Sequence, residues 1–228
     1  MSIEEILKIS EEKNKHKIIS FKESDKSLKL GIMGGTFNPI HNAHIGICEC
    51  IMNKLKLDKI VFMPAGDPPH KKNTLYKDHR YNMVLLSTSE KEEFIVSDYE
   101  ILQRNKKTYT IDTLKYLKSS YPKSELYFIT GSDAINNIES WKDFKDIFKY
   151  AKFVVALRPG IDNKATFKNI DRFKKEYKAE IIVVHVPQMN ISSTDIRENI
   201  KSDGVKDMLP TNVWEYISKL SLYGGADR

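Results

Sequence analysis

The stretch that decides the fold is LKLGIMGGTFNPIHNAHIG, residues 28–46. Its apolar first half ends in paired glycines and predicts a buried strand over residues 28–34. Directly after it, Ile47, Ile51 and Leu55 recur at helical spacing and predict a helix over residues 41–55. A strand that leads at once into a helix begins a rhythm, which the rest of the chain should repeat.

The rhythm continues to the end of the chain. Further strands are predicted at 59–64, within 92–100, and at 125–131, 152–160 and 180–187, the fourth running into a turn. Helices are predicted over 79–90, 111–121, 164–177, 194–202 and 212–220, and separate helical turns are predicted within 134–150. Apolar runs indicate strands buried on both faces, so the fold class is α/β, a doubly wound parallel sheet with helices on both faces. Ligands bind such sheets outside the carboxyl ends of the strands, so the functional residues should follow the strands.

The first 27 residues differ in character from the rest. They are polar and charged, and Ile3, Ile6, Leu7 and Ile9 form one modest amphipathic turn. This pattern predicts a short helix and a linker, both mobile, ahead of the main fold. We therefore divide the chain into an N-terminal polar, helical extension (1–27) and a main domain (28–228).

Composition narrows the class of protein. The 228 residues are 40% hydrophobic and 30% charged, and the net charge of +6 favours anionic partners such as phosphates or nucleotides. The lysines are spread along the chain, so nucleic acid is not expected as a partner. The two cysteines, Cys48 and Cys50, are poorly spaced for a disulfide and suggest a reducing compartment. With no signal peptide or long apolar run evident, we expect a cytoplasmic protein with no membrane partner.

The opening stretch also carries chemistry. Gly34 and Gly35 follow the first strand, where glycine lets backbone N–H groups approach a ligand. The pattern is neither GxGxxG nor GxxxxGK[ST]. His41 and His44 fall at the predicted helix start, where N–H groups and the helix dipole favour an anion. Their spacing of three, without a glutamate between them, does not match the HExxH zinc pattern, so no metal ligand is assigned.

A second phosphate-facing element follows the last predicted strand, in MNISSTDIRENI at 189–200. Ser192 and Asp195 match a capping box, which by itself indicates only a helix start. Three consecutive hydroxyls, Ser192, Ser193 and Thr194, precede Arg197 on the first turns. Hydroxyls, backbone N–H groups and a guanidinium at one helix start together favour an oxyanion.

These two elements resemble a known superfamily. GGTFNPIHNAH and ISSTDIR are similar to the nucleotidylyltransferase patterns GxFxPxHxGH and ISSTxIR. Between and around them, PAGDPPHKK, SDYEILQRNKKTYTIDTL, YFITGSDAINNIESW and ALRPG resemble the bacterial nicotinate-nucleotide adenylyltransferases, in that order. The resemblance covers about residues 28–223 and implies a Rossmann-like sheet. It departs from the family pattern at Ala43, where the family has glycine.

The resemblance implies an activity and its residues. Members join ATP to nicotinate mononucleotide, giving deamido-NAD and pyrophosphate, by in-line attack of the mononucleotide phosphate on the α-phosphorus of ATP, with Mg²⁺ on the ATP phosphates. By this likeness the catalytic residues are His41, His44 and Arg197. ATP-binding residues are Gly34, Gly35, Thr36, Phe37, Gly131, Asp133, Ser192, Ser193 and Thr194. Residues for the mononucleotide are Lys71, Thr110, Trp141 and Arg158.

Alternatives remain open at this stage. Trp141 could instead be a core residue, Asp133 and Lys71 solvated loop residues, and Arg158 structural. The acceptor could be nicotinamide mononucleotide or phosphopantetheine, or the chain could bind nucleotide or RNA without catalysis. The oligomeric state, monomer or homodimer, and the role of residues 1–27 are not readable from the sequence.

Overall fold

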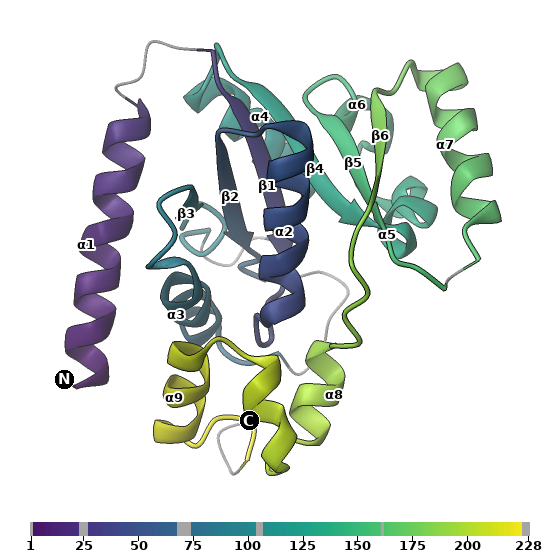
Figure 1. Ribbon diagram of the computed structural model, residues 1–228. Coiled ribbons are helices and arrows are strands. Elements are labelled where there is room, and N and C mark those ends of the chain that lie inside the picture. The colour runs from purple at the N-terminus through teal and green to yellow at the C-terminus, as the bar shows by residue number, and fades with distance from the viewer. Residues whose placement is uncertain (1, 23–26, 68–73, 104–106, 161, 225–228) are drawn as a thin grey trace.

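The computed structural model of the chain (Figure 1) describes residues 2–22, 27–67, 74–103, 107–160 and 162–224. One parallel sheet of six strands lies at its centre, in the order β3-β2-β1-β4-β5-β6. The strands are β1 (Lys29–Gly35), β2 (Lys59–Pro64), β3 (Phe94–Val96), β4 (Glu125–Gly131), β5 (Lys152–Leu157) and β6 (Ile181–His185). This order reverses direction between β1 and β4, which is the switch point of a doubly wound fold. The predicted fold class is confirmed.

Helices cover both faces of this sheet. On one face lie α2 (Asn42–Leu55) and α3 (Lys77–Thr88). Their core cluster with Phe62 and Phe94 also includes residues of α8 (Ser193–Glu198), η2 (Asp203–Met208) and α9 (Thr211–Lys219), and α8 and α9 lie beyond the carboxyl ends of the strands (Figure 1). On the other face lie α4 (Thr110–Ser120), α5 (Ser132–Asn136), η1 (Ile138–Ser140), α6 (Phe144–Ile147) and α7 (Lys164–Tyr177), which share a second cluster with Phe128 and Phe153. Successive residues of each strand point to opposite clusters, which is why the strands are apolar throughout.

The N-terminal segment forms a longer helix than predicted. Helix α1 (Ile3–Lys22) has 20 residues and lies beside α3 and the edge strand β3 (Figure 1). The most buried residues of its inner face are polar, namely Ser10, Asn14 and Lys17, while Ile3, Ile6 and Leu7 pack partly buried against the core. The Asn14 side chain accepts from the Val96 N–H (2.9 Å) and donates to the Val96 carbonyl (3.0 Å), so it pairs with the open edge of β3.

A buried cation fixes the same helix further along. The Lys17 Nζ donates to three backbone carbonyls at the carboxyl end of α3, those of Thr88 (3.1 Å), Ser89 (3.0 Å) and Lys91 (2.8 Å). Carbonyls at a helix end lack partners within the helix, and a cation there also opposes the helix dipole. Helix α1 is therefore held by hydrogen bonds to the main chain. The division of the chain at residue 27 stays a proposal.

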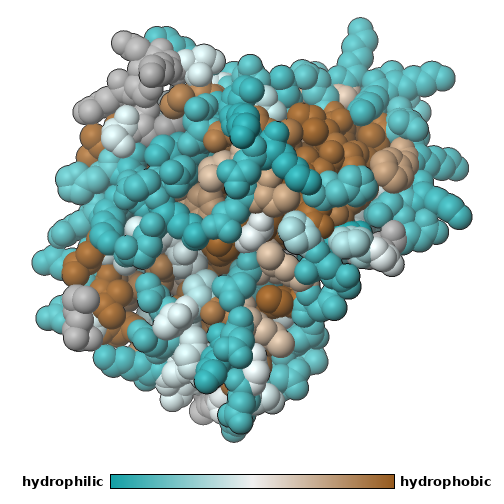
Figure 2. Space-filling model, in the orientation of Figure 1, coloured by the Kyte–Doolittle hydropathy of each residue, from teal (hydrophilic) through white to brown (hydrophobic). Residues whose placement is uncertain are grey.

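The surface is mainly hydrophilic in the view of Figure 2. Hydrophobic residues gather over the part of the sheet at β5 and β6, where Ile182 of the edge strand is only partly buried. Of the helices that the structure describes, none combines the length and the apolar character needed to cross a membrane.

Candidate active site

The chain leaves β1 through a tight turn that places Phe37. The backbone of Phe37 is in the left-handed region (φ 49°), and its ring is buried at 2% exposure. A Cβ on Gly35 would lie 3.0 Å from this ring, so the glycine makes room for Phe37. The ring packs edge-on against His44, with centroids 5.2 Å apart. The Phe37 side chain thus belongs to the core, and only its backbone can face a nucleotide.

The two predicted histidines lie against each other at the start of α2. Their ring centroids are 3.7 Å apart, and the His41 backbone N–H donates to Nδ1 of His44 (3.2 Å). Because Nδ1 of His44 accepts this bond, a neutral His44 carries its proton on Nε2. That arrangement gives His44 a donor at Nε2 and fixes the orientation of its ring.

His41 has a different role in the pair. It is the N-cap residue of α2, and its side chain is only 4% exposed. Burial, and to a smaller extent the positive charge of Arg158, together lower the pKa of His41 to about 4. At neutral pH His41 is therefore uncharged, and its ring packs against the ring of His44.

Helix α8 is hydrogen-bonded to the turn before α2. The Arg197 Nη1 donates to the Asn38 carbonyl (2.8 Å), and the Ser193 hydroxyl donates to the Pro39 carbonyl (2.8 Å). These bonds join segments 154 and 159 residues apart in the sequence. The structure thus brings the two predicted phosphate-facing elements together at the carboxyl end of β1, as the rule for parallel sheets requires.

The three predicted hydroxyls are engaged in different ways. Ser192 is the N-cap of α8: its hydroxyl accepts from the Asp195 N–H (3.1 Å) and donates to the Asp195 carboxylate (2.7 Å). The single protons of Ser192 and Ser193 are thus donated within the protein. Thr194 accepts from Arg197 Nη2 (3.2 Å), which leaves the Thr194 proton for a ligand. Of these residues, Arg197 and Thr194 therefore keep protons that can be donated to an anion.

Asn38 is a residue that the sequence motifs did not single out. Its side-chain oxygen accepts from the Leu75 N–H (3.3 Å) and the Tyr223 hydroxyl (2.9 Å), while its carbonyl accepts from Arg197. Asn38 therefore joins the turn before α2 to three distant segments. The one local signal was its place before a proline, and the Asn38–Pro39 peptide bond is cis.

Two of the residues predicted for the mononucleotide, Thr110 and Trp141, lie at the start of α4 and just after η1. Thr110 is the first residue of α4 and is half-buried, as is Trp141, whose ring lies edge-on to Phe128 (6.0 Å). Trp141 is thus attached to the core on one side and accessible on another. Lys142, which the sequence motifs missed, links the two segments: its Nζ lies 3.1 Å from Asp112 Oδ2 and 4.8 Å from the Tyr109 ring centroid.

Further predicted residues lie at the carboxyl ends of strands β1, β4 and β5. Gly131 ends β4, Asp133 lies in the first turn of α5, and Arg158 follows β5, so all three follow strands as predicted. All three are exposed. Gly34 lies within β1 beside Met63 of β2, and the Thr36 carbonyl accepts a hydrogen bond from Arg80 (2.7 Å). Lys71 lies outside the residues that the structure describes.

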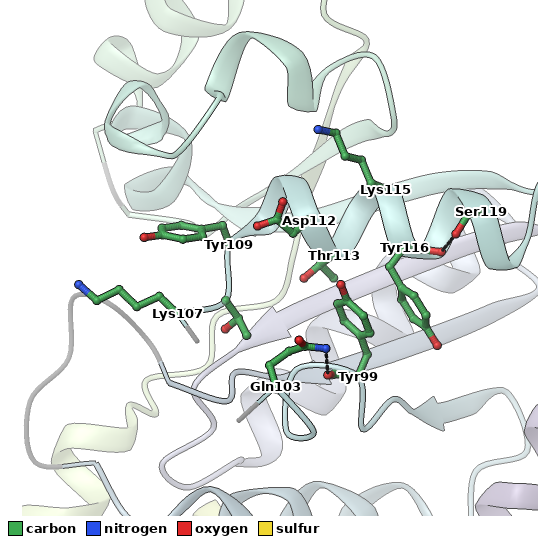
Figure 3. A pocket seen from close by; sticks show the side chains of 10 residues that line it. Tyr99, Gln103, Lys107, Tyr109, Asp112, Thr113, Lys115, Tyr116 and Ser119 are labelled. Carbon is green, nitrogen blue, oxygen red and sulfur yellow. Dashed lines mark hydrogen bonds between the residues drawn. The ribbon is translucent and has the colours of Figure 1, made fainter. Parts of the chain in front are cut away.

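A pocket of about 620 Å³ lies beside the start of α4 (Figure 3). It is lined by Tyr99, Gln103, Lys107, Thr108, Tyr109, Asp112, Thr113, Lys115, Tyr116 and Ser119. Tyr99 and Tyr116 stack in parallel within it, with centroids 3.8 Å apart. The pocket adjoins Thr110 but includes none of the predicted site residues, so it is separate from the histidine and arginine cluster.

The fold and the paired elements at the end of β1 match a known family. A family model described as cytidylyltransferase-like matches residues 32–199 of the chain. The chain therefore belongs to the cytidylyltransferase-like family of nucleotidyltransferases. Relatives of this chain carry a narrower name, nicotinate-nucleotide adenylyltransferase.

Curated relatives carry that narrower name over nearly their whole length. A "Probable nicotinate-nucleotide adenylyltransferase" of Thermoanaerobacter sp. is 44% identical over 203 residues, covering 87% of this chain and 96% of the relative. A protein of the same name from Clostridium tetani is 39% identical over 198 residues, covering 86% and 98%. The chain is therefore a member of the nicotinate-nucleotide adenylyltransferases, and the predicted family is confirmed.

Solved structures agree on the fold. The nicotinic acid mononucleotide adenylyltransferase of Plasmodium falciparum complexed with NaAD matches with a TM-score of 0.69 at 23% identity. The match covers 86% of this chain and 97% of that one. At this identity the likeness supports the architecture alone.

Proposed function

We propose that this enzyme transfers the adenylyl group of ATP to nicotinate mononucleotide, giving deamido-NAD and pyrophosphate in NAD biosynthesis. Its relatives are named for this activity, and one structural neighbour is complexed with NaAD. The structural observation that supports the proposal most is the hydrogen-bonded joint of Arg197 and Ser193 with the turn before α2. It gathers donors from two distant motifs where a triphosphate could contact both.

The reaction that we propose is a direct displacement. An oxygen of the mononucleotide phosphate attacks the α-phosphorus of ATP, and the bond from that phosphorus to the bridging oxygen of pyrophosphate breaks. Negative charge grows on the phosphate oxygens, so catalysis consists of positioning and charge stabilisation. His44 supplies a donor at Nε2, Arg197 supplies guanidinium donors, and neutral His41 holds the His44 ring in place.

Mg²⁺ enters with ATP in this proposal. Within the described parts of the chain, no group of three or more His, Cys, Asp or Glu side chains could hold a metal ion. An ion that is held mainly by phosphate oxygens and water does not need such a group, and Mg²⁺ often binds in that way. The ion would neutralise phosphate charge, and Arg197 and Thr194 would contact the same β- and γ-phosphates.

The acceptor site in this proposal lies at the start of α4. The accessible face of Trp141 stacks on the pyridine ring, and the Thr110 backbone amide meets the nicotinate carboxylate. Asp133 contacts ribose hydroxyls, while Arg158 contacts phosphate. We further propose that the enzyme works in the cytoplasm, as a monomer or homodimer.

The proposal is tested by incubating the purified protein with ATP, Mg²⁺ and one acceptor at a time: nicotinate mononucleotide, nicotinamide mononucleotide or phosphopantetheine. Pyrophosphate release and the new dinucleotide are measured together. We expect both products with nicotinate mononucleotide and less with the amide. Absence of pyrophosphate with either pyridine mononucleotide would contradict the proposal, and product with phosphopantetheine alone would replace it.

A further inference from the structure

Helix α3 carries an arginine that is buried almost completely. Arg80 is 1% exposed, and among the residues that the structure describes no carboxylate forms an ion pair with it. Its guanidinium instead donates to three backbone carbonyls: Nε to Leu75 (2.9 Å), Nη1 to Thr36 (2.7 Å) and Nη2 to Gly66 (2.8 Å). Burying a charge is costly, so such a residue needs a reason beyond packing.

The three carbonyls come from three different segments. Thr36 lies in the turn after β1 that is predicted to face ATP, Gly66 follows β2, and Leu75 precedes α3. A guanidinium is planar, and its N–H groups leave at fixed angles. Arg80 therefore fixes these segments relative to one another, which a flexible lysine with one nitrogen could do only in part.

Gly66 carries the connection further, to Glu100. A Cβ on Gly66 would collide with the backbone carbonyl of Glu100, so the two backbones are in direct contact. The Glu100 carboxylate is 8% exposed, and its Oε1 accepts from the Thr113 hydroxyl on α4 (2.5 Å). Burial raises the pKa of Glu100, whereas the Thr113 hydroxyl, the Gly66 amide and the Arg80 charge oppose that shift.

The contacts therefore run from one substrate site to the other. They begin at the Thr36 carbonyl, pass through Arg80, Gly66 and Glu100, and end at Thr113 in the first turns of α4. We propose that Arg80 is a positioning residue that sets the ATP-facing turn and the pyridine-facing start of α4 in one fixed relation. This inference rests on the proposed adenylyl transfer, because it assigns one substrate to each end of the network.

The test compares Arg80→Met and Arg80→Lys with a matched control. Lys17→Met removes another buried cation that donates to three backbone carbonyls, but on the far side of α3. We expect Arg80→Met to lower kcat/KM about 100-fold for both substrates, because a displacement of about 1 Å can cost that much. Arg80→Lys should recover part of the loss. Lys17→Met should lower the melting temperature while both KM values stay within about twofold of wild type.

A second variant tests the far end of the network. Glu100→Gln keeps the shape but removes the charge, and we expect the KM for the mononucleotide to rise about tenfold with the KM for ATP little changed. This split, together with the Arg80→Lys recovery, would not follow from a general loss of stability. If Arg80→Met does not fold, Arg80→Lys and Glu100→Gln decide the matter.

The inference is overturned if folded Arg80 variants keep wild-type kcat/KM for both substrates, or if Lys17→Met lowers kcat/KM as much as they do. Failure of the proposed function is distinguishable, since it shows as missing product in the wild-type protein. In that case, binding of ATP to wild type and Arg80→Lys is compared by calorimetry without any acceptor. Equal affinities would then overturn the role of Arg80, and weaker binding by the variant would support it.

Discussion

The half of the candidate site proposed to bind phosphate is joined by hydrogen bonds between distant segments, whereas the half proposed to bind the pyridine ring also relies on a contact at the surface. Arg197 and Asn38 bond across the first half at 2.8 Å. In the second half, Lys142 and Asp112 form an ion pair with both side chains 44% exposed. Exposed pairs of this kind contribute little to stability, because water screens the charges. If the proposed function holds, the comparison implies that the phosphate-binding half is preformed, while the half that binds the pyridine ring depends more on the substrate itself.

The largest effect should come from the phosphate-facing half. His44→Ala removes a placed donor, and losing one such donor costs about 2.7–4 kcal/mol in the transition state. We expect kcat to fall at least about 100-fold, with the KM for the mononucleotide little changed. Steady-state kinetics with each substrate varied would measure this. His185→Ala, at the end of β6, is the matched control, and near-normal kcat in His44→Ala would remove His44 from the mechanism.

The second effect is on stability and depends on pH. The pKa of His41 is lowered from 6.5 to about 4 by burial, so the unfolded chain binds more protons between these values. The free energy of unfolding should therefore fall as pH drops from about 6.5 to about 4, by roughly 3 kcal/mol from this residue.

Urea denaturation at several pH values measures this slope. In His41→Asn the contribution should be missing, so its stability should vary less over the same range. If the free energy of unfolding of that variant varied with pH as it does in wild type, His41 would titrate normally in the folded protein. The conclusion that His41 is a buried, neutral part of the phosphate-binding half would then be wrong.

A third, smaller effect concerns the half proposed to bind the pyridine ring. Trp141→Ala should raise the KM for the mononucleotide about tenfold, since stacking on an aromatic side chain contributes about 1–3 kcal/mol. The KM for ATP should stay within about twofold, and Trp141→Phe should recover part of the affinity. Equal changes in both KM values would mean that Trp141 mainly supports the core through Phe128.

The smallest effect is expected at Ala43, where the family pattern has glycine. Its methyl group is 1% exposed within α2, so it packs into the core. Ala43→Gly should lower stability by about 0.5–1 kcal/mol, the usual difference between these residues in a helix. Thermal denaturation and kcat/KM should show a slightly lower melting temperature and activity within about twofold. A large gain in activity would mean that the methyl group hinders substrate.

Most of the fold could be predicted from sequence, because its strands are apolar runs that end in turn residues. Ile32 and Phe62, for example, are fully buried in strands predicted within one or two residues of their bounds. Helix α1 was the exception. Its buried positions include Asn14 and Lys17, so the 3.6-residue apolar pattern that normally indicates a docked helix is weak there.

The candidate site divides in the same way. The histidines, Ser193 and Arg197 belong to short motifs and could be found from them. Asn38, Arg80 and Glu100 could not, because their importance lies in bonds to the backbone of distant segments. A charged residue in a helical pattern normally indicates a solvated face, and only the folded chain shows that Arg80 is buried.

Helix α1 has a further consequence. Asn14 and Lys17 recognise an amide N–H and carbonyl oxygens, atoms that residues share whatever their side chains. Substitutions at Val96, Thr88 or Ser89 that preserve the local backbone should leave this recognition intact. These polar contacts of the helix therefore depend on the backbone conformation of its neighbours and not on their side chains. The side chains of the edge strand β3 can therefore change in sequence while its backbone keeps its hydrogen bonds to Asn14.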